Sequence, residues 1–147
     1  MGSPFTGGCE CGAVRYECTA EPLVMFNCHC RACQQVTGGP YVPVIVFPSK
    51  AFKITKGALR YHFTNSVRGE RHPNKRGFCP DCGSRVTGGE TNKPLPWVGV
   101  TASSLDDPTR FHAQYDIFTS HAQPWDMMDP TLSKHAEHRP RKTADDA

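Results

Sequence analysis

Seven of the eight cysteines lie in three short clusters, and their spacing constrains the fold more than any other feature of the chain. The clusters are Cys9-Glu10-Cys11, Cys28-His29-Cys30-Arg31-Ala32-Cys33 and Cys79-Pro80-Asp81-Cys82. Cysteines separated by one or two residues can direct two thiolates at one tetrahedral metal ion, most commonly zinc. The clusters therefore predict that metal ions organise the fold.

The number of clustered cysteines indicates two kinds of site. A closed structural zinc site uses four protein ligands, whereas a catalytic zinc keeps three and leaves one position for water or substrate. Seven cysteines divide into four and three, so we expect two Zn²⁺ ions per chain. His29, His62, His72 or a carboxylate could instead complete a second closed site, and spacing alone leaves that alternative open.

Disulfides are the main alternative for cysteines at this density. The chain begins without an apparent secretion signal, and clustered cysteines in a reducing compartment are more often metal sites. Close neighbours such as Cys9 and Cys11 are also poorly placed to pair with each other. A thioredoxin-type redox pair at Cys79 and Cys82 would need a βαβ pattern, which the sequence does not show.

Length and composition limit the class of protein. The 147 residues suit a single domain, and 13 Gly and 13 Pro favour short strands and turns over a helix bundle. No apolar run approaches the roughly 20 residues that cross a bilayer, so we predict a cytoplasmic protein that does not enter membranes. The formal net charge is only +3 with scattered Lys and Arg, which does not favour nucleic acid as a partner.

Alternation and short apolar runs predict a mainly β fold. We expect a domain over residues 1–129 and, because apolar residues become rare, a loose tail over 130–147. Residues 66–77 are predicted to be a loop or an edge hairpin whose basic side chains, Arg76 among them, are solvated. The predicted strands cover residues 13–18, 23–26, 41–47, 51–55, 58–64, 84–87, 95–100 and 114–119, and one helical turn over 31–36 ends at Gly38-Gly39.

Cys18 and His29 are predicted to face away from the metal ions. Cys18 lies on the apolar face of the alternating segment 13–18 and is predicted to be a core residue. His29 lies between two cysteines that are predicted to face a metal. Strand alternation puts it on the opposite face, where packing or a supporting hydrogen bond is expected.

The second cluster favours thiol chemistry. Three thiolates on one Zn²⁺ leave the site with an excess negative charge, so the ion is a weaker Lewis acid than one held by neutral imidazoles. Such a site suits a fourth thiolate taken from a substrate better than it suits activation of water.

The three clusters also resemble those of a known family. Gly8-Cys9-Glu10-Cys11-Gly12-Ala13-Val14-Arg15-Tyr16, Cys28-His29-Cys30-Arg31-Ala32-Cys33-Gln34 and Phe78-Cys79-Pro80-Asp81-Cys82-Gly83 resemble the glutathione-dependent formaldehyde-activating family, which includes the centromere protein V domain. The resemblance covers roughly residues 5–128. It implies a single-domain, tent-like fold of short antiparallel sheets with zinc knuckles.

The resemblance divides the cysteines between two sites. It implies a structural zinc at Cys9, Cys11, Cys79 and Cys82, and a catalytic zinc at Cys28, Cys30 and Cys33. The implied activity is that of a carbon-sulfur lyase, with glutathione or another small thiol as partner and S-hydroxymethylglutathione as the adduct with formaldehyde. The alternatives are a non-enzymatic zinc-binding module that contacts protein or nucleic acid, and a redox sensor that releases zinc when Cys28 to Cys33 are oxidised.

Overall fold

Short strands dominate the computed structural model, which describes residues 2–64, 74–90 and 94–140. The described residues contain one α-helix, α1 (Arg31–Thr37), and brief 3₁₀ turns at Ser49–Ala51, Ala102–Ser104, Pro108–Arg110 and Thr119–His121. The strands are β1 (Phe5–Gly8), β2 (Arg15–Cys18), β3 (Val24–Cys28), β4 (Val42–Pro48), β5 (Phe52–Lys56), β6 (Arg60–Thr64), β7 (Asn74–Phe78), β8 (Arg85–Glu90), β9 (Trp97–Thr101), β10 (Tyr115–Ile117) and β11 (Ser133–Lys134). The predicted mainly β class is confirmed.

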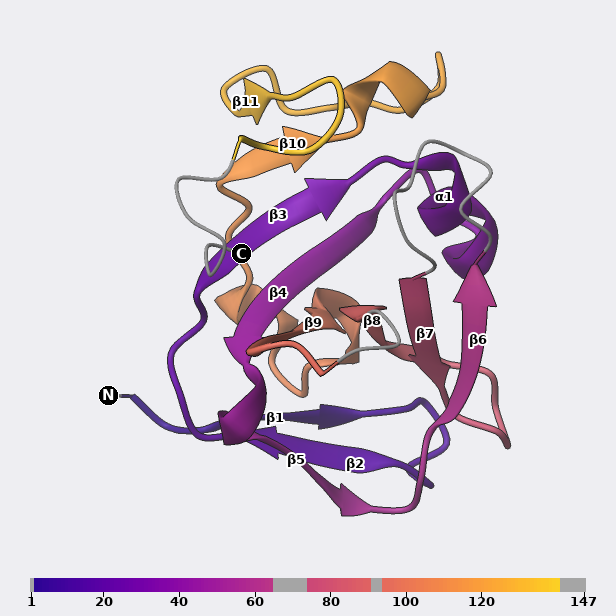
Figure 1. Cartoon of the computed structure of the whole chain (residues 1–147), viewed down its shortest axis with the longest axis vertical. Coiled ribbons are helices and arrows are strands. Elements are labelled where there is room, and N and C mark those ends of the chain that lie inside the picture. Colours follow the sequence, from indigo (N-terminus) through magenta and orange to yellow (C-terminus); the bar gives the residue numbers. More distant parts are fainter. Residues whose placement is uncertain (1, 65–73, 91–93, 141–147) are drawn as a thin grey trace.

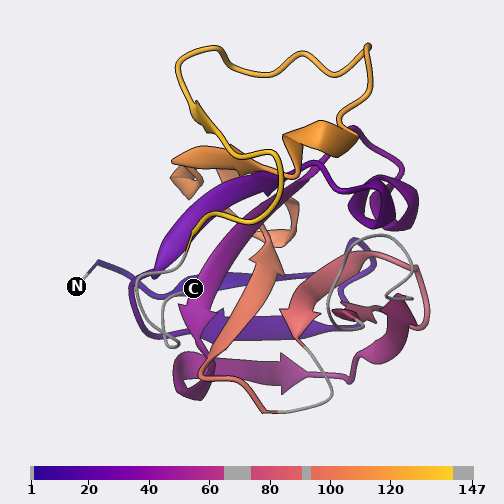
Figure 2. The same ribbon diagram turned by 45° about the horizontal axis from the view of Figure 1, so that its top comes forward.

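The strands form two sheets (Figure 1). A three-stranded sheet has the order β1-β2-β5, and an eight-stranded sheet has the order β11-β10-β3-β4-β9-β8-β7-β6. Neighbouring strands are antiparallel except at β10, which pairs in parallel with both β3 and β11. The second view shows β10 and the segment that follows it above β3, away from the three-stranded sheet (Figure 2).

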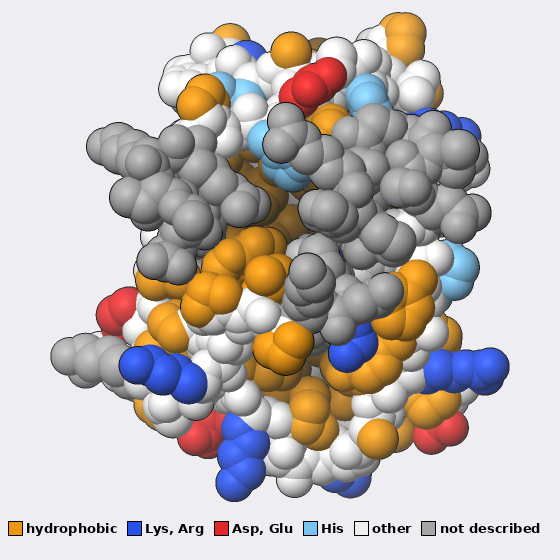
Figure 3. All heavy atoms as spheres, viewed as in Figure 1, with side chains coloured by type: hydrophobic (Ala, Val, Ile, Leu, Met, Phe, Trp, Pro, Cys, Tyr) orange, Lys and Arg blue, Asp and Glu red, His pale blue; other side chains and the backbone are white. Residues whose placement is uncertain are grey.

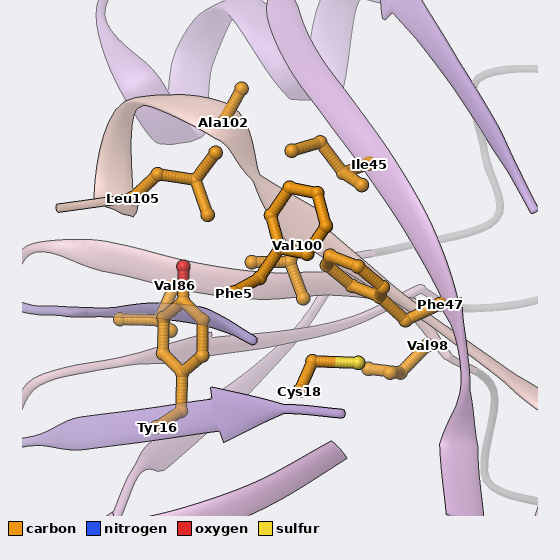
Figure 4. Close-up of a cluster of buried hydrophobic side chains, with 10 residues drawn as sticks. All are labelled: Phe5, Tyr16, Cys18, Ile45, Phe47, Val86, Val98, Val100, Ala102 and Leu105. Carbon is orange, nitrogen blue, oxygen red and sulfur yellow. The ribbon is translucent and has the colours of Figure 1, made fainter. Parts of the chain in front are cut away.

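The main core fills the space between the two sheets (Figure 4). Tyr16 and Cys18 of β2 meet Ile45 and Phe47 of β4, and all four are at most 1% exposed. The prediction that Cys18 is a core residue is confirmed. Burial of these side chains is the main force that holds the sheets together.

Most predicted strands are confirmed with shifted ends, and the described part of the polar segment before the third cluster confirms the predicted edge hairpin. Residues 65–73, which include His72, lie outside the described residues. Residues 74–78 form β7, which pairs with β6 as a hairpin at the edge of the larger sheet. Arg76 on β7 is only 4% exposed, so the prediction that its charge is solvated is wrong.

Part of the predicted tail contacts the rest of the molecule. β11 pairs with β10, the N–H of Phe118 donates to the carbonyl of Glu137 at 3.0 Å, and the N–H of His135 donates to the carbonyl of Asp116 at 3.0 Å. These bonds hold residues 133–137 beside β10. The domain boundary after residue 129 stays a prediction.

The described helices are short. The seven residues of α1 fall far below the roughly 20 that span a bilayer, and no helix in the described ranges is long and apolar enough to do so.

Candidate metal centres

Four cysteines from two distant turns meet where the two sheets approach each other. Cys9 and Cys11 lie in the turn between β1 and β2, and Cys79 and Cys82 lie in the turn between β7 and β8. Their Sγ atoms all lie within 4.8 Å of one another. We call this group the four-cysteine cluster.

The sulfur positions in this cluster fit a zinc ion. The Sγ atoms of Cys9 and Cys11 are 3.6 Å apart, and those of Cys11 and Cys79 are 3.8 Å apart. Tetrahedral zinc with Zn–S bonds of about 2.3 Å separates its sulfurs by about 3.8 Å. The cluster therefore has the spacing of a closed zinc site that joins the small sheet to the large one.

Both turns depend on a glycine directly after the second cysteine. Gly12 and Gly83 have φ angles of 79° and 77°, a region that disfavours residues with a Cβ atom. The N–H of Gly12 donates to the carbonyl of Cys9 at 3.2 Å, and the N–H of Gly83 donates to that of Cys79 at 2.9 Å. Each glycine thus lets the chain fold back and bring two sulfurs together.

Backbone and hydroxyl groups support the sulfurs of the four-cysteine cluster. The N–H of Val14 donates to Cys9 Sγ at 3.2 Å, and the N–H of Asp81 approaches Cys79 Sγ at 3.4 Å. The hydroxyl of Ser84, 3.2 Å from Cys82 Sγ, is the main cause that lowers the pKa of that thiol to about 6. Such donors favour the thiolate form that binds metal.

The remaining three clustered cysteines meet where β3 leads into α1. Cys28 ends β3, Cys30 caps the N-terminus of α1, and Cys33 lies in its first turn. Their Sγ atoms lie within 4.8 Å of one another, with 3.5 Å between those of Cys28 and Cys33. We call this group the three-cysteine cluster.

A cysteine caps this helix in place of the usual oxygen. The N–H of Cys33 donates to Cys30 Sγ at 3.2 Å, so one sulfur both starts the helix and faces its neighbours. At the other end, Gly38 adopts a left-handed conformation and its N–H donates to the carbonyl of Gln34 at 2.8 Å. The short helix therefore fixes the position of Cys33 relative to Cys30.

The three-cysteine cluster is buried, in contrast to the exposed Cys11 and Cys82. Cys28, Cys30 and Cys33 are 8%, 3% and 4% exposed, and they pack with apolar residues of β3, β4 and β10. The sulfur spacing again fits a tetrahedral zinc ion. Among the described residues, no histidine or carboxylate joins these three ligand atoms.

His29 is turned away from the sulfurs and is fully buried in a network of acidic residues. Its Nε2 is 2.8 Å from Asp116 Oδ1, and its Nδ1 is 2.5 Å from Asp126 Oδ2. Asp116 also accepts from Asn27 Nδ2 at 3.1 Å and pairs with Lys134 Nζ at 2.8 Å. Burial acts to raise the pKa of Asp116, but bonds from Lys134, His29 and Asn27 outweigh it and lower that pKa. The predicted supporting role of His29 is confirmed as hydrogen bonding.

Two arginines flank the three-cysteine cluster. Arg76 Nη1 lies 3.3 Å from Cys33 Sγ. Contacts with the sulfurs of Cys28 and Cys30, followed by the nearby Arg76 charge, hold the pKa of Cys33 well below its usual range. Burial and the charge of Arg76 lower the pKa of Arg85 to about 10, while the charges of all three cysteines act in the opposite direction. The sequence alone did not indicate either arginine.

The contact between Arg76 and Cys33 shows how strongly the large sheet curls. Arg76 lies on β7, which is four strands away from β3 in the order of the sheet. A flat sheet would separate these strands by about 19 Å. The curl is what brings a basic strand next to the cysteines that follow β3.

All eight cysteines are free in the structure, so none of them is paired as a disulfide. The sulfur contacts of 3.5 to 3.8 Å within the clusters are far longer than the roughly 2.05 Å of a disulfide bond. The observed arrangement matches metal ligation, with four sulfurs in one group and three in the other.

Comparison with known proteins agrees with this arrangement. A protein from Rhodobacter sphaeroides with a crystal structure is similar in fold, with a TM-score of 0.53 and 24% sequence identity over 71% of this chain and 93% of that one. The family model described as glutathione-dependent formaldehyde-activating enzyme matches residues 4–121, a range that contains both cysteine clusters. The chain therefore belongs to the glutathione-dependent formaldehyde-activating enzyme family.

Proposed function

We propose that this protein is a zinc-dependent carbon-sulfur lyase that acts on small thiols, with glutathione and formaldehyde as its reactants. Membership of the family supports a glutathione-related activity. The observation that carries the proposal is the three-cysteine cluster, a buried group of three sulfurs at zinc spacing beside a positively charged side chain. Three ligands suit a metal ion that also binds substrate.

The two clusters would have separate roles. In the proposal, Cys9, Cys11, Cys79 and Cys82 hold a structural zinc, and Cys28, Cys30 and Cys33 hold a catalytic one. A zinc ion held by three thiolates supplies a position at which a substrate thiol binds in its ionised form. Arg76 offsets the negative charge that gathers on the sulfurs, and the apolar packing around Cys28 and Cys33 limits access of water.

The proposed reaction is a reversible addition. A bond forms between the thiol sulfur and the carbonyl carbon of formaldehyde, and the thiol proton ends on the carbonyl oxygen. The reverse reaction breaks the same carbon-sulfur bond and returns the proton to sulfur. No oxidant or reductant is needed, which agrees with the choice of a metal that has no redox chemistry.

Metal content gives the first test. The native protein should contain two zinc ions per chain, and Cys30→Ser should contain one while it remains folded. Cys18→Ala is the matched control, because Cys18 is buried in the core outside both clusters and its loss should leave both ions in place. One zinc ion or none in carefully purified native protein would contradict the proposal.

Catalysis gives the second test. Thiols and formaldehyde combine without an enzyme, so the measurement is the rate of exchange between free and adduct glutathione by NMR with ¹³C-formaldehyde. The native protein should accelerate this exchange, and Cys30→Ser should not. In the cobalt-substituted protein, glutathione should also change the visible absorption. A non-enzymatic zinc module would leave both the exchange rate and the spectrum unchanged.

A further inference from the structure

The side chain of Arg85 contains a buried hydrogen-bond donor that lacks a protein partner. Its Nε donates to the carbonyl of Thr87 at 2.7 Å, but its Nη1 is buried and has no hydrogen-bond partner among the described residues. A buried charged donor without a partner is unfavourable. Arg76 differs, because it contacts both Cys33 Sγ and Thr64 Oγ1.

The position of Arg85 is built into the sheet by a glycine. A Cβ atom at Gly88 would lie 2.0 Å from Arg85 Nη2, so the guanidinium occupies the space that a side chain at 88 would fill. Gly88 is the register partner of Gly99 on β9. The guanidinium of Arg85 thus lies over the bare backbone of Gly88.

Register places this guanidinium on the same face of the sheet as the three-cysteine cluster. Gly99 is paired with Gly88 on one side and with Val46 of β4 on the other, and register partners point to the same face. Val46 packs in the group of side chains that contains Cys28 and Cys33. On the face shown in Figure 3, hydrophobic side chains gather over β4.

The charges near the three-cysteine cluster favour an anionic ligand. A zinc ion with three thiolates has one excess negative charge, and Arg76 and Arg85 together bring two positive charges. One positive charge remains, and it acts in surroundings that water screens poorly because the sulfurs and Arg76 are buried. A substrate thiol that binds in its ionised form would balance this charge, so what points to a second acidic group is the unpartnered Nη1 of Arg85 and not the net charge.

We propose that Arg85 is a substrate-binding residue that recognises a carboxylate of the thiol substrate, so that the protein selects thiols that are also carboxylic acids. This inference rests on the proposed function. Arg85 is suited to the role because a guanidinium binds a carboxylate through two parallel N–H groups, and its Nη1 lacks a partner. Arg76, whose contacts are to Cys33 and Thr64, is a positioning residue.

The test compares two small thiols in the cobalt-substituted protein. N-acetylcysteine has a carboxylate, and its methyl ester does not. Dissociation constants come from the change in visible absorption as each thiol is added. The ratio of the two constants is compared between variants, which cancels the difference in acidity between the two thiols.

The native protein should bind the acid more tightly than the ester, and Arg85→Gln should reduce this preference by about tenfold to a hundredfold. Arg60→Gln is the matched control, because it removes the same charge from an exposed position on β6 and should keep the preference. Gly88→Ala should reduce the preference too, since its methyl group displaces the guanidinium without removing the charge. If Arg85→Gln does not retain two metal ions, Gly88→Ala becomes the variant that decides whether Arg85 recognises the carboxylate.

Two results would overturn the inference and leave the proposed function intact. One is that native protein binds acid and ester equally well, and the other is that Arg85→Gln, with both metal ions present, keeps the full preference. If neither thiol changes the spectrum of the native protein, the proposed function fails, and this inference fails with it.

Discussion

The two cysteine clusters place sulfurs at the same spacing but surround them differently. In the four-cysteine cluster, backbone N–H groups and the hydroxyl of Ser84 face the sulfurs, and two of the cysteines are exposed. In the three-cysteine cluster, every sulfur is buried, and the guanidinium of Arg76 faces Cys33 in addition to the backbone N–H that faces Cys30. Neutral donors suit a closed site, whose charge stays constant. A long and flexible charged side chain suits a site whose charge changes when substrate binds.

The clusters also differ in what they connect. The four-cysteine cluster joins turns of two separate sheets, whereas the three cysteines all come from one stretch of six residues. Loss of the first should remove one of the links between the sheets and leave the core between them as the other. Loss of the second should leave both sheets in place, so the effects of equivalent substitutions should differ widely.

The largest expected effect is that of Cys79→Ser. Cys79 is fully buried, and the binding energy of a structural zinc in small domains, about 10–16 kcal/mol, is comparable with the whole stability of a domain. We expect this variant to lose cooperative folding, as measured by circular dichroism and thermal unfolding. Cys30→Ser is the comparison and should unfold cooperatively. Similar behaviour of the two variants would remove the distinction between a structural and a catalytic cluster.

An intermediate effect is expected for His29→Gln. A glutamine cannot contact both Asp116 and Asp126 as the imidazole does, so one buried carboxylate loses its partner. The free energy of unfolding should fall by about 3 kcal/mol, measured by urea denaturation. His112→Gln, at an exposed position, should change it by less than about 0.5 kcal/mol. If His29→Gln lowered the free energy of unfolding as little as His112→Gln, the buried network around His29 would not stabilise the fold next to the three-cysteine cluster.

The smallest expected effect is a shift in the pH at which zinc leaves the three-cysteine cluster in Arg76→Gln. Acid releases zinc by protonating the sulfurs, and Arg76 helps to keep the pKa of Cys33 low. Without the guanidinium this pKa rises, protons compete at higher pH, and the midpoint of release should move up by about 0.5 pH unit. A chromogenic chelator follows the release.

Two comparisons identify the site of that shift. Cys30→Ser, which lacks the three-cysteine centre, shows the release from the four-cysteine cluster alone, and Arg60→Gln controls for net charge. An unchanged midpoint in Arg76→Gln, or an equal shift at both clusters, would mean that Arg76 does not act specifically on Cys33.

Local patterns in the sequence predicted much of the fold. Alternation located β2, because a half-buried strand alternates apolar and polar side chains. Short apolar runs located β3, β4 and β9, because a strand that is buried on both faces is apolar along its length. Spacing identified all seven clustered cysteines. It could not pair the first cluster with the third, and that division came from resemblance to a family.

Elements that depend on tertiary contacts were missed, as β1 was, or left open between a loop and an edge hairpin, as β7 was. β1 contains Thr6, Gly7 and Gly8, and β7 contains Asn74, Lys75 and Arg76, so neither has the apolar pattern of a strand. The burial of Arg76 and Asp116 follows only from partners that lie far away in the sequence. A charged residue normally indicates exposure, and only the folded chain reveals the opposite charge or sulfur that makes burial favourable.

β7 links the two clusters directly. Arg76 contacts Cys33, and three residues later Cys79 begins the turn of the other cluster. Since successive strand residues face opposite sides, one inserted or deleted residue between positions 76 and 79 would turn Arg76 away from Cys33 or pull Cys79 out of its turn. The number of residues in this short segment fixes the spacing between the two clusters. The segment should therefore tolerate no insertion or deletion, even at positions where the side chain can vary.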